Sequence, residues 1–213
     1  MSFGYIGDTS TSVKQQVKNK GILTTQESFD LERQGFLGGS LELIETQTIS
    51  SAVASLDFNS IKGNQFDVHL LDIANIIPAT DSQPTYLRFS NDGGSSYEAG
   101  TSYKYALQNG GYGSGTFEEH KSTGTSAINL TNNTGNATNE TINLYCYIYN
   151  ANNSSKFTFA SYQGVFMFST GQMVMMFGGG VYPTAETINA FQILKGSGNM
   201  TQGFAKLYGV KQI

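Results

Sequence analysis

Apolar and polar residues alternate with a period of two along most of the chain from Thr46 onward. Such alternation predicts β-strands that bury one face. It is clearest in the stretches Ala52–Phe58, Gln65–Ile77 and Ile142–Tyr149. Short segments rich in Gly, Asn, Asp and Ser separate the alternating runs, and we expect about ten strands. The pattern favours an all-β, jelly-roll-like two-sheet β-sandwich over a parallel α/β fold.

The stretch Pro84–Leu107 contains two alternating segments around a polar, hydroxyl-rich turn. Leu87 and Phe89 share one face of the first segment, and Tyr103 shares a face with Leu107 in the second. The sequence Asn-Asp-Gly-Gly at 91–94 tolerates the positive φ angles of a chain reversal. We therefore predict a β-hairpin with a long tip.

Residues 109–141 are polar and rich in glycine, asparagine and threonine. Only Ala127–Leu130 is expected to form a strand. The rest of this segment has too few apolar residues to pack on a core, so we expect long surface loops. The remaining strands are expected at 156–161, 164–168, 171–177, 187–195 and 204–210. The three glycines at 178–180 do not open a helix and are therefore not a phosphate-binding loop.

Residues 1–45 differ from the rest of the chain and are expected to form an N-terminal docking arm, extended with short helices, ahead of a β-sandwich domain at 46–213. A Thr-Thr-Gln-Glu capping box at 24–27 predicts a helix over 25–34, and a shorter helix is expected at 13–18. The segment is too short and polar to hold its own core. Two interpretations stay open, a flexible tail and an arm that becomes ordered on a partner. The apolar residues expected to dock such an arm are Phe3, Tyr5, Ile6, Val13, Val17, Phe29, Leu31, Phe36 and Leu37.

Charged residues make up only 13% of the 213 residues, about half the usual share. The net charge is −4 and no basic cluster is present, so nucleic acid is not an expected partner. No apolar run approaches the ~20 residues of a membrane span, so we expect no membrane insertion. Low charge with abundant Phe, Tyr and Met is typical of a surface that neighbouring subunits cover. The candidate self-association residues are Tyr145, Tyr147, Tyr149, Met173, Met175 and Phe177.

No set of residues indicates catalysis, and we expect no enzyme activity, no cofactor and no metal site. His69 lies within a strand pattern, and His120 follows two glutamates without further ligands in view. Cys146 lies in an aromatic strand, which favours a buried and inert thiol. Exposed aromatic rings beside Gly- and Asn-rich loops nevertheless suit sugars. The candidate glycan contacts are Tyr97, Tyr103 and Tyr112.

Three stretches resemble small structural proteins of tailed bacteriophages, particularly phages of marine bacteria. They are YLRFSNDGGSSYEAGTSYKYA at 86–106, GSGNMTQGFAKLYGV at 196–210, and the leader VKQQVKNKGIL with LERQGFLGGSLELI within 13–44. The resemblance implies a virion protein on the particle surface, frequently a homotrimer. Such a protein is a head decoration (cement) protein or a short fibre, and its arm binds capsid or tail proteins.

Two functions therefore follow as expectations. The first is a non-enzymatic virion structural protein whose partners are other virion proteins and further copies of itself. The alternative is a carbohydrate-binding, receptor-recognition module of a tail fibre, whose partner is a host-surface glycan. A β-sandwich supports either function, so the fold alone does not separate them.

Overall fold

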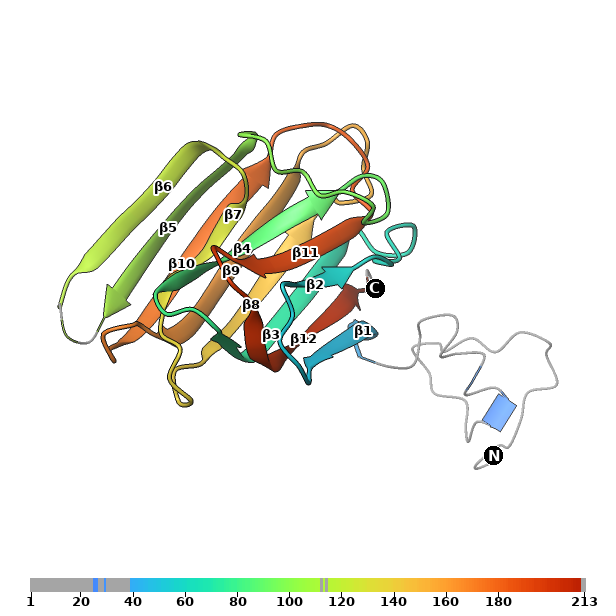
Figure 1. The fold of residues 1–213 in the computed structure, drawn as a ribbon. Coiled ribbons are helices and arrows are strands. Elements are labelled where there is room, and N and C mark those ends of the chain that lie inside the picture. The colour runs from blue at the N-terminus through green and yellow to red at the C-terminus, as the bar shows by residue number, and fades with distance from the viewer. Residues whose placement is uncertain (1–24, 27–28, 30–38, 112, 114, 212–213) are drawn as a thin grey trace, which may run out of the picture. The chain divides into compact units, whose positions relative to one another are not determined.

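The computed structural model describes residues 25–26, 29, 39–111, 113 and 115–211, and these residues form two antiparallel β-sheets packed face to face (Figure 1). The expected all-β sandwich is confirmed. The strands are β1 (Leu41–Ile49), β2 (Ser55–Phe58), β3 (Val68–Pro78), β4 (Gln83–Ser90), β5 (Tyr103–Gly111), β6 (Phe117–Thr125), β7 (Ile128–Thr134), β8 (Ile142–Tyr149), β9 (Thr158–Met167), β10 (Met173–Tyr182), β11 (Ala190–Lys195) and β12 (Met200–Val210).

The strand order is that of a jelly roll with two insertions. Within the described residues, the large sheet has the order β1-β12-β3-β8-β9-β10-β5-β6 and the small sheet has the order β2-β11-β4-β7. The quartets β1-β12-β3-β8 and β2-β11-β4-β7 are the two halves of a jelly roll, in which the chain passes repeatedly from one sheet to the other. The pairs β5–β6 and β9–β10 are inserted and widen the large sheet beyond β8, so the jelly-roll prediction is confirmed.

The hairpin predicted over Pro84–Leu107 is wrong. β4 pairs with β11 and β7 in the small sheet, whereas β5 pairs with β10 and β6 in the large sheet. Phe89 and Tyr103 are both buried because their strands turn an apolar face toward the same core from opposite sides. Periodicity identifies the buried face of a strand and not its partner. The polar segment 91–102 is therefore a crossover between the sheets, and the turn at 196–199 is another.

Several strand boundaries also differ from the sequence-based prediction. β6 occupies part of the segment 109–141 that was expected to form loops, whereas β7 includes most of the strand expected at Ala127–Leu130 and extends it to Thr134. β6 escapes detection because it is an edge strand, exposed along most of its length, with no apolar alternation to read. The first strand begins at Leu41 and not at Thr46, and the single strand β9 replaces the two expected at 156–168.

Two glycines of β10 allow close packing within and between the sheets. A Cβ atom at Gly180 would lie 2.6 Å from Cγ2 of Ile128 in β7, and one at Gly178 would lie 2.6 Å from Cβ of Leu107 in β5. Both distances are shorter than packed carbon atoms tolerate. The glycine run is thus part of a strand, which agrees with its exclusion as a phosphate-binding loop.

Aromatic rings from both sheets form the centre of the core. The ring centroid of Phe89 lies 5.7 Å from that of Phe191 and 5.9 Å from that of Tyr103. The hydroxyl group of Tyr103 accepts a hydrogen bond of 2.8 Å from the backbone N–H of Phe89. This residue therefore joins the two sheets by packing and by satisfying a buried donor.

The N-terminal arm falls mostly outside the described residues. Thr25, Gln26 and Phe29 are helical and exposed, in agreement with the helix expected over 25–34. The chain divides into one unit of Leu43–Val210 and a second of Met1–Glu42 with Lys211–Ile213. The other predicted docking residues lie outside the described part of the chain: Phe3, Tyr5, Ile6, Val13, Val17, Leu31, Phe36 and Leu37.

A lysine is buried in the small sheet. Lys195 is 4% exposed, and its Nζ donates hydrogen bonds of 2.9 Å to the hydroxyl oxygens of Thr85 and Thr134. Among the described residues, no carboxylate forms an ion pair with it. Desolvation disfavours the charged ammonium group, and burial lowers the pKa of Lys195 to about 7.

The lowered pKa predicts how stability changes with pH. Between the ordinary pKa of 10.5 and about 7, the unfolded chain binds a proton that the folded chain does not. The free energy of unfolding should therefore fall as the pH decreases through this range, by about 1.4 kcal/mol per pH unit from this group. Lys195→Met should lack this contribution and be more stable than wild type at pH 7. Chemical denaturation of both proteins from pH 6 to pH 10 measures the difference, and parallel pH profiles would contradict the prediction.

Candidate functional site

The outer face of the large sheet brings together all six predicted self-association residues. In β8 and β10, alternate residues are buried, and the tyrosines of β8 and Met173, Met175 and Phe177 of β10 occupy the opposite, outward positions. Phe177 lies opposite Gln163 of β9, and Gln163 lies opposite Tyr145 of β8. Segments about thirty residues apart in sequence thus form one surface. We call the outward side of β8, β9 and β10 the aromatic face.

β9 contributes two further residues to the aromatic face that the sequence did not single out. Phe159 lies opposite Tyr149, and Val165 lies opposite Met175. Their side chains are 45% and 47% exposed, slightly more than Phe177 at 43%. They were missed because the sequence was read as two short strands with a break near Tyr162. A continuous alternation from Thr158 to Met167 was the signal that could have found them.

The tyrosines of the aromatic face are ordered by contacts within it. The rings of Tyr145 and Tyr147 meet edge to face at 6.1 Å between centroids, and those of Tyr147 and Tyr149 stack at 6.4 Å. The hydroxyl of Tyr145 donates to Oε1 of Gln163 at 2.9 Å, and the hydroxyl of Tyr149 lies 3.2 Å from that of Ser161. These polar atoms already have partners, so the face offers apolar ring surface for contact.

The aromatic face has an uncharged centre and charged margins. The structure describes every residue of β8, β9 and β10, and none of their outward residues is charged. Charges appear only on the flanking strands. Asp72 of β3 lies opposite Lys206 of β12 on one side, and Lys104 of β5 with the ion pair Glu119–Lys121 of β6 lies on the other. An apolar, aromatic centre with a polar rim is the anatomy of a protein–protein interface.

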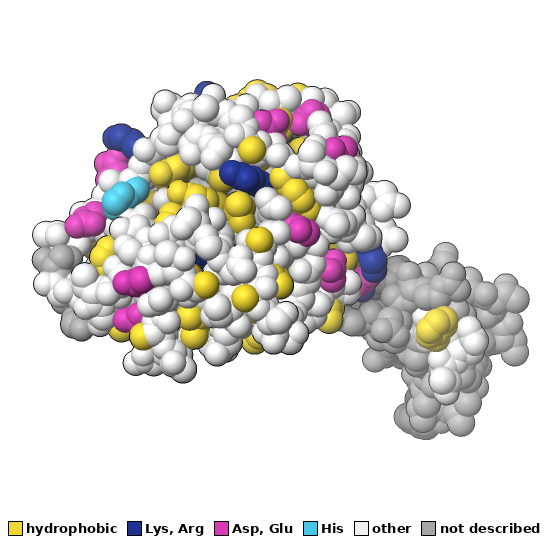
Figure 2. All heavy atoms as spheres, in the orientation of Figure 1, with side chains coloured by type: hydrophobic (Ala, Val, Ile, Leu, Met, Phe, Trp, Pro, Cys, Tyr) yellow, Lys and Arg dark blue, Asp and Glu magenta, His cyan; other side chains and the backbone are white. Residues whose placement is uncertain are grey.

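The outer face of the small sheet is different. Asp57 of β2 and Arg88 of β4 lie on this face, and both are held by neighbours. Nε2 of Gln192 donates to Asp57 at 2.8 Å, and Nε of Arg88 donates to the backbone carbonyl of Ser126 at 3.0 Å. Figure 2, in which this side faces the reader, shows acidic and basic side chains dispersed among apolar ones. The small sheet thus presents a surface of mixed charged and apolar side chains, in contrast to the aromatic face.

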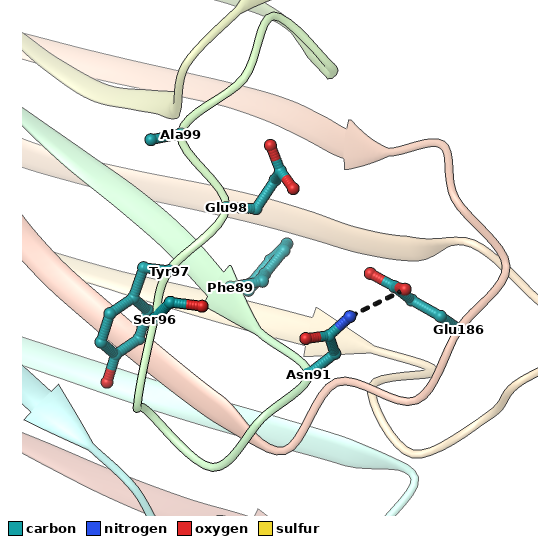
Figure 3. A pocket seen from close by; sticks show the side chains of 7 residues that line it. All are labelled: Phe89, Asn91, Ser96, Tyr97, Glu98, Ala99 and Glu186. Atoms are coloured by element: carbon teal, nitrogen blue, oxygen red, sulfur yellow. Dashed lines mark hydrogen bonds between the residues drawn. The ribbon is translucent and has the colours of Figure 1, made fainter.

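A polar pocket of about 120 Å³ lies beside the crossover that follows β4 (Figure 3). Asn91 donates to one carboxylate oxygen of Glu186 at 3.0 Å, and the hydroxyl of Tyr182 donates to the other at 2.9 Å. Glu98 lies on the opposite side of the opening, and the ring of Tyr97 points away from both glutamates. The pocket is therefore acidic, and its aromatic neighbour does not cover it.

The three candidate glycan contacts differ in their exposure, and one of them lies outside the described residues. Tyr97 borders this pocket, but it is half-buried and its hydroxyl donates to Oδ1 of Asn59 at 2.7 Å. Burial also raises the pKa of Tyr97. The assignment of Tyr103 as a glycan contact is wrong, because this residue is fully buried between the sheets. Tyr112 lies outside the described residues.

His69 and Cys146 are both buried, in agreement with the strand positions that the sequence predicts for them. His69 is buried, its Nε2 lies 2.7 Å from the carbonyl oxygen of Ile61, and desolvation lowers its pKa. Burial raises the pKa of the Cys146 thiol, which makes the thiolate inaccessible near neutral pH.

In the described part of the chain, no group of three or more His, Cys, Asp or Glu side chains is placed to hold a metal ion. The described residues also contain no helix long and apolar enough to cross a membrane.

A hydrogen-bonded aspartate organises the start of the crossover. The carboxylate of Asp92 accepts hydrogen bonds from the hydroxyl of Ser90 at 2.7 Å and from the backbone N–H and hydroxyl of Ser96 at 2.9 and 2.6 Å. These bonds, those from Ser96 first, lower the pKa of Asp92 to about 2. The ionised carboxylate therefore stabilises this turn.

The aspartate predicts an acid-sensitive turn. Because the pKa is depressed in the folded state, the stabilisation is complete above pH 3.8 and should be lost as the pH falls through about 2. Asp92→Ala should speed hydrogen exchange at the Ser96 amide at neutral pH, while the amides of β4 keep their protection. NMR titration of the Asp92 carboxyl carbon measures its pKa directly. A midpoint at the ordinary value of 3.8 would rule out this role.

Comparison with known proteins gives no family for this chain. No protein-family model matches it, and no curated protein matches its sequence significantly.

Proposed function

We propose that this chain is a non-enzymatic structural protein of a tailed-phage particle, a head decoration protein or a short fibre. Its sandwich is exposed on the particle surface, and its N-terminal arm binds capsid or tail proteins. The observation that carries the proposal is the aromatic face, a surface suited to lasting contact with protein. The resemblance to phage virion proteins is what supports a phage particle as the assembly that contains this chain. The two downstream stretches that carry the resemblance form the end of β4, the crossover and the start of β5, and the turn before β12 with the whole of that strand.

The partner of the aromatic face is a second copy of this chain. A surface without charges at its centre needs a partner that also lacks charges there, and the same face of another copy meets this requirement. The six adjacent strands from β12 to β5 present a face of roughly 850 Å², at about 4.8 Å per strand and 3.3 Å per residue. This is about the area that each partner contributes to a standard interface.

The proposed assembly is a homotrimer, the state that the phage resemblance implies. Three copies can turn their aromatic faces toward one three-fold axis, so that each face contacts those of two neighbours, and this closed symmetry leaves no copy with an uncovered aromatic face. Exposed rings such as Phe159 and Phe177 are then buried between subunits, where aromatic side chains contribute most to binding.

A carbohydrate-binding, receptor-recognition module remains the alternative function. The acidic pocket beside Tyr97 supports it, since carboxylate and amide groups bind sugar hydroxyls. The burial of Tyr103 removes one of its expected contacts. Particle attachment without any effect on host adsorption would favour the structural function alone.

The first test places a charge on the aromatic face. Phe177→Asp buries an unpaired carboxylate in the proposed interface and should reduce the trimer to a monomer at micromolar concentration. Because Phe177 is 43% exposed, the sandwich should still fold. Asn133→Asp, which adds the same charge at an exposed position of β7, is the control and should leave the mass unchanged. Light scattering after size exclusion gives the masses. A wild-type monomer would refute self-association, and a dimer would refute the trimer but not the face.

The second test removes the arm. Deletion of residues 1–38 leaves β1 and all later strands intact, so the remaining protein should unfold cooperatively near the wild-type temperature. It should no longer join particles assembled without the protein, because the proposed attachment residues are gone. Circular dichroism on heating and cosedimentation with such particles measure the two effects. Attachment of the truncated protein would show that the sandwich, and not the arm, binds the particle.

A further inference from the structure

The large sheet extends beyond the small sheet at the hairpin β5–β6. The last strand of the small sheet, β7, packs on β9, β10 and β5, and β6 lies beyond it. Glu118 and His120 of β6 lie opposite Asn109 and Leu107 of β5, on the inward side of the sheet. A fully covered strand would carry apolar residues at these positions. The polar side chains indicate that this inner surface remains open.

A pocket of about 110 Å³ lies on this overhang, between β5–β6 and the turn that joins β9 to β10. Asn109 and Glu118 contribute an amide and a carboxylate from the hairpin. Phe168, Thr170 and Gln172 contribute a ring, a hydroxyl and a second amide from the turn. Elements far apart in the chain thus place polar groups and one aromatic ring around a single opening.

Glycine at position 113 helps to shape the pocket. A Cβ atom there would lie 2.6 Å from Nε2 of Gln172, so a side chain at this position would displace the glutamine amide. The glycine leaves room for Gln172 to reach the pocket wall. The position of this amide therefore depends on residues from both sides of the pocket.

Asn109 is the unusual member of the pocket. It is only 5% exposed, yet its Oδ1 has no hydrogen-bond partner among the described residues. A buried acceptor without a partner destabilises a fold, and an apolar residue of similar size at this position of β5 would avoid that. Its place in the lining of a pocket indicates that the missing partner comes from a bound molecule.

We propose that this pocket binds a neutral saccharide. Amide, hydroxyl and carboxylate groups together donate to and accept from sugar hydroxyls, and the ring of Phe168 provides an apolar surface for the C–H groups of a sugar ring. Glu118 disfavours an anion such as a phosphate. A divalent cation such as calcium takes six or more oxygen ligands, commonly from several carboxylates, and the pocket supplies only Glu118. The volume admits one edge of a sugar ring, as at the end of a glycan chain.

This proposal goes beyond the structural function and does not depend on it. The pocket lies on the inner side of the large sheet, whereas the aromatic face lies on its outer side. Binding is measured on the isolated protein, and light scattering on the same sample reports its oligomeric state. Failure of one proposal is thus distinguishable from failure of the other.

The experiment is saturation-transfer NMR on the full chain. The probes are the methyl glycosides of glucose, galactose, mannose and N-acetylglucosamine and their disaccharides, each at millimolar concentration. At least one should bind, with a dissociation constant in the millimolar range. Glu118→Ala should weaken its binding about tenfold or more and Gln172→Ala about fivefold, because each removes a hydrogen bond to the sugar.

Two matched controls accompany these variants. Glu119→Ala removes the next carboxylate of β6, which lies on the opposite side of the sheet, and Gln202→Ala removes an exposed amide of β12. Neither should change binding. Equal weakening by Glu119→Ala and Glu118→Ala would overturn the assignment of the pocket.

Asn109→Leu separates binding from folding. It replaces the unsatisfied amide with an apolar side chain of similar size, so the melting temperature should stay equal or rise while saccharide binding is lost. Binding that survives this substitution would overturn the role of Asn109. Saturation transfer to none of the probes would mean that the pocket holds ordered water only, and the proposal would then be wrong.

Discussion

The contact between Tyr103 and Phe89 fixes the relation of the two sheets. The rings pack across the interior, and the tyrosine hydroxyl accepts the backbone N–H of Phe89. β4 and β5 therefore approach each other face to face and cannot pair edge to edge. Once β5 is held in this orientation, its register with β10 places Phe177 outward and Met176 in the core. The orientation of the aromatic face thus follows from a contact on the other side of the sheet.

The two-layer architecture and the unequal width of the sheets leave both candidate surfaces uncovered. A four-strand sheet covers only part of the inner side of a sheet twice as wide, and no described element covers the outer side. Where the inner side is uncovered, at β6, the residues are polar and a pocket forms. The outer side of β8 to β10 is also uncovered, yet its residues are tyrosine, phenylalanine, methionine and valine. The uncovered inner side at β6 carries polar residues, whereas the uncovered outer side of β8 to β10 carries apolar residues. Only the outer side therefore needs a protein partner.

Sequence periodicity predicted the strands and their faces better than their partners. The outward position of Tyr145 and of Phe177 could be read from alternation, because each depends only on the strand that contains it. The separation of Phe89 and Tyr103 into different sheets could not, since two strands that face one core show the same alternation whether they are neighbours or lie opposite. The pocket was beyond prediction for a related reason. Asn109 belongs to a segment without apolar alternation, and its surroundings come from a turn some sixty residues later.

The edge strand β6 constrains how copies of this chain associate. An exposed edge presents unpaired backbone groups and invites other strands to extend the sheet. β6 carries Glu118, Glu119, His120 and Lys121 in succession, and such charges oppose edge-to-edge pairing. The aromatic face has no comparable protection. If β6 of one copy paired with the other edge strand, β1, of the next copy, the association would continue without limit, whereas packing of faces ends when each face is covered. The distribution of charge therefore favours a closed assembly through side-chain contacts over an open one through the backbone.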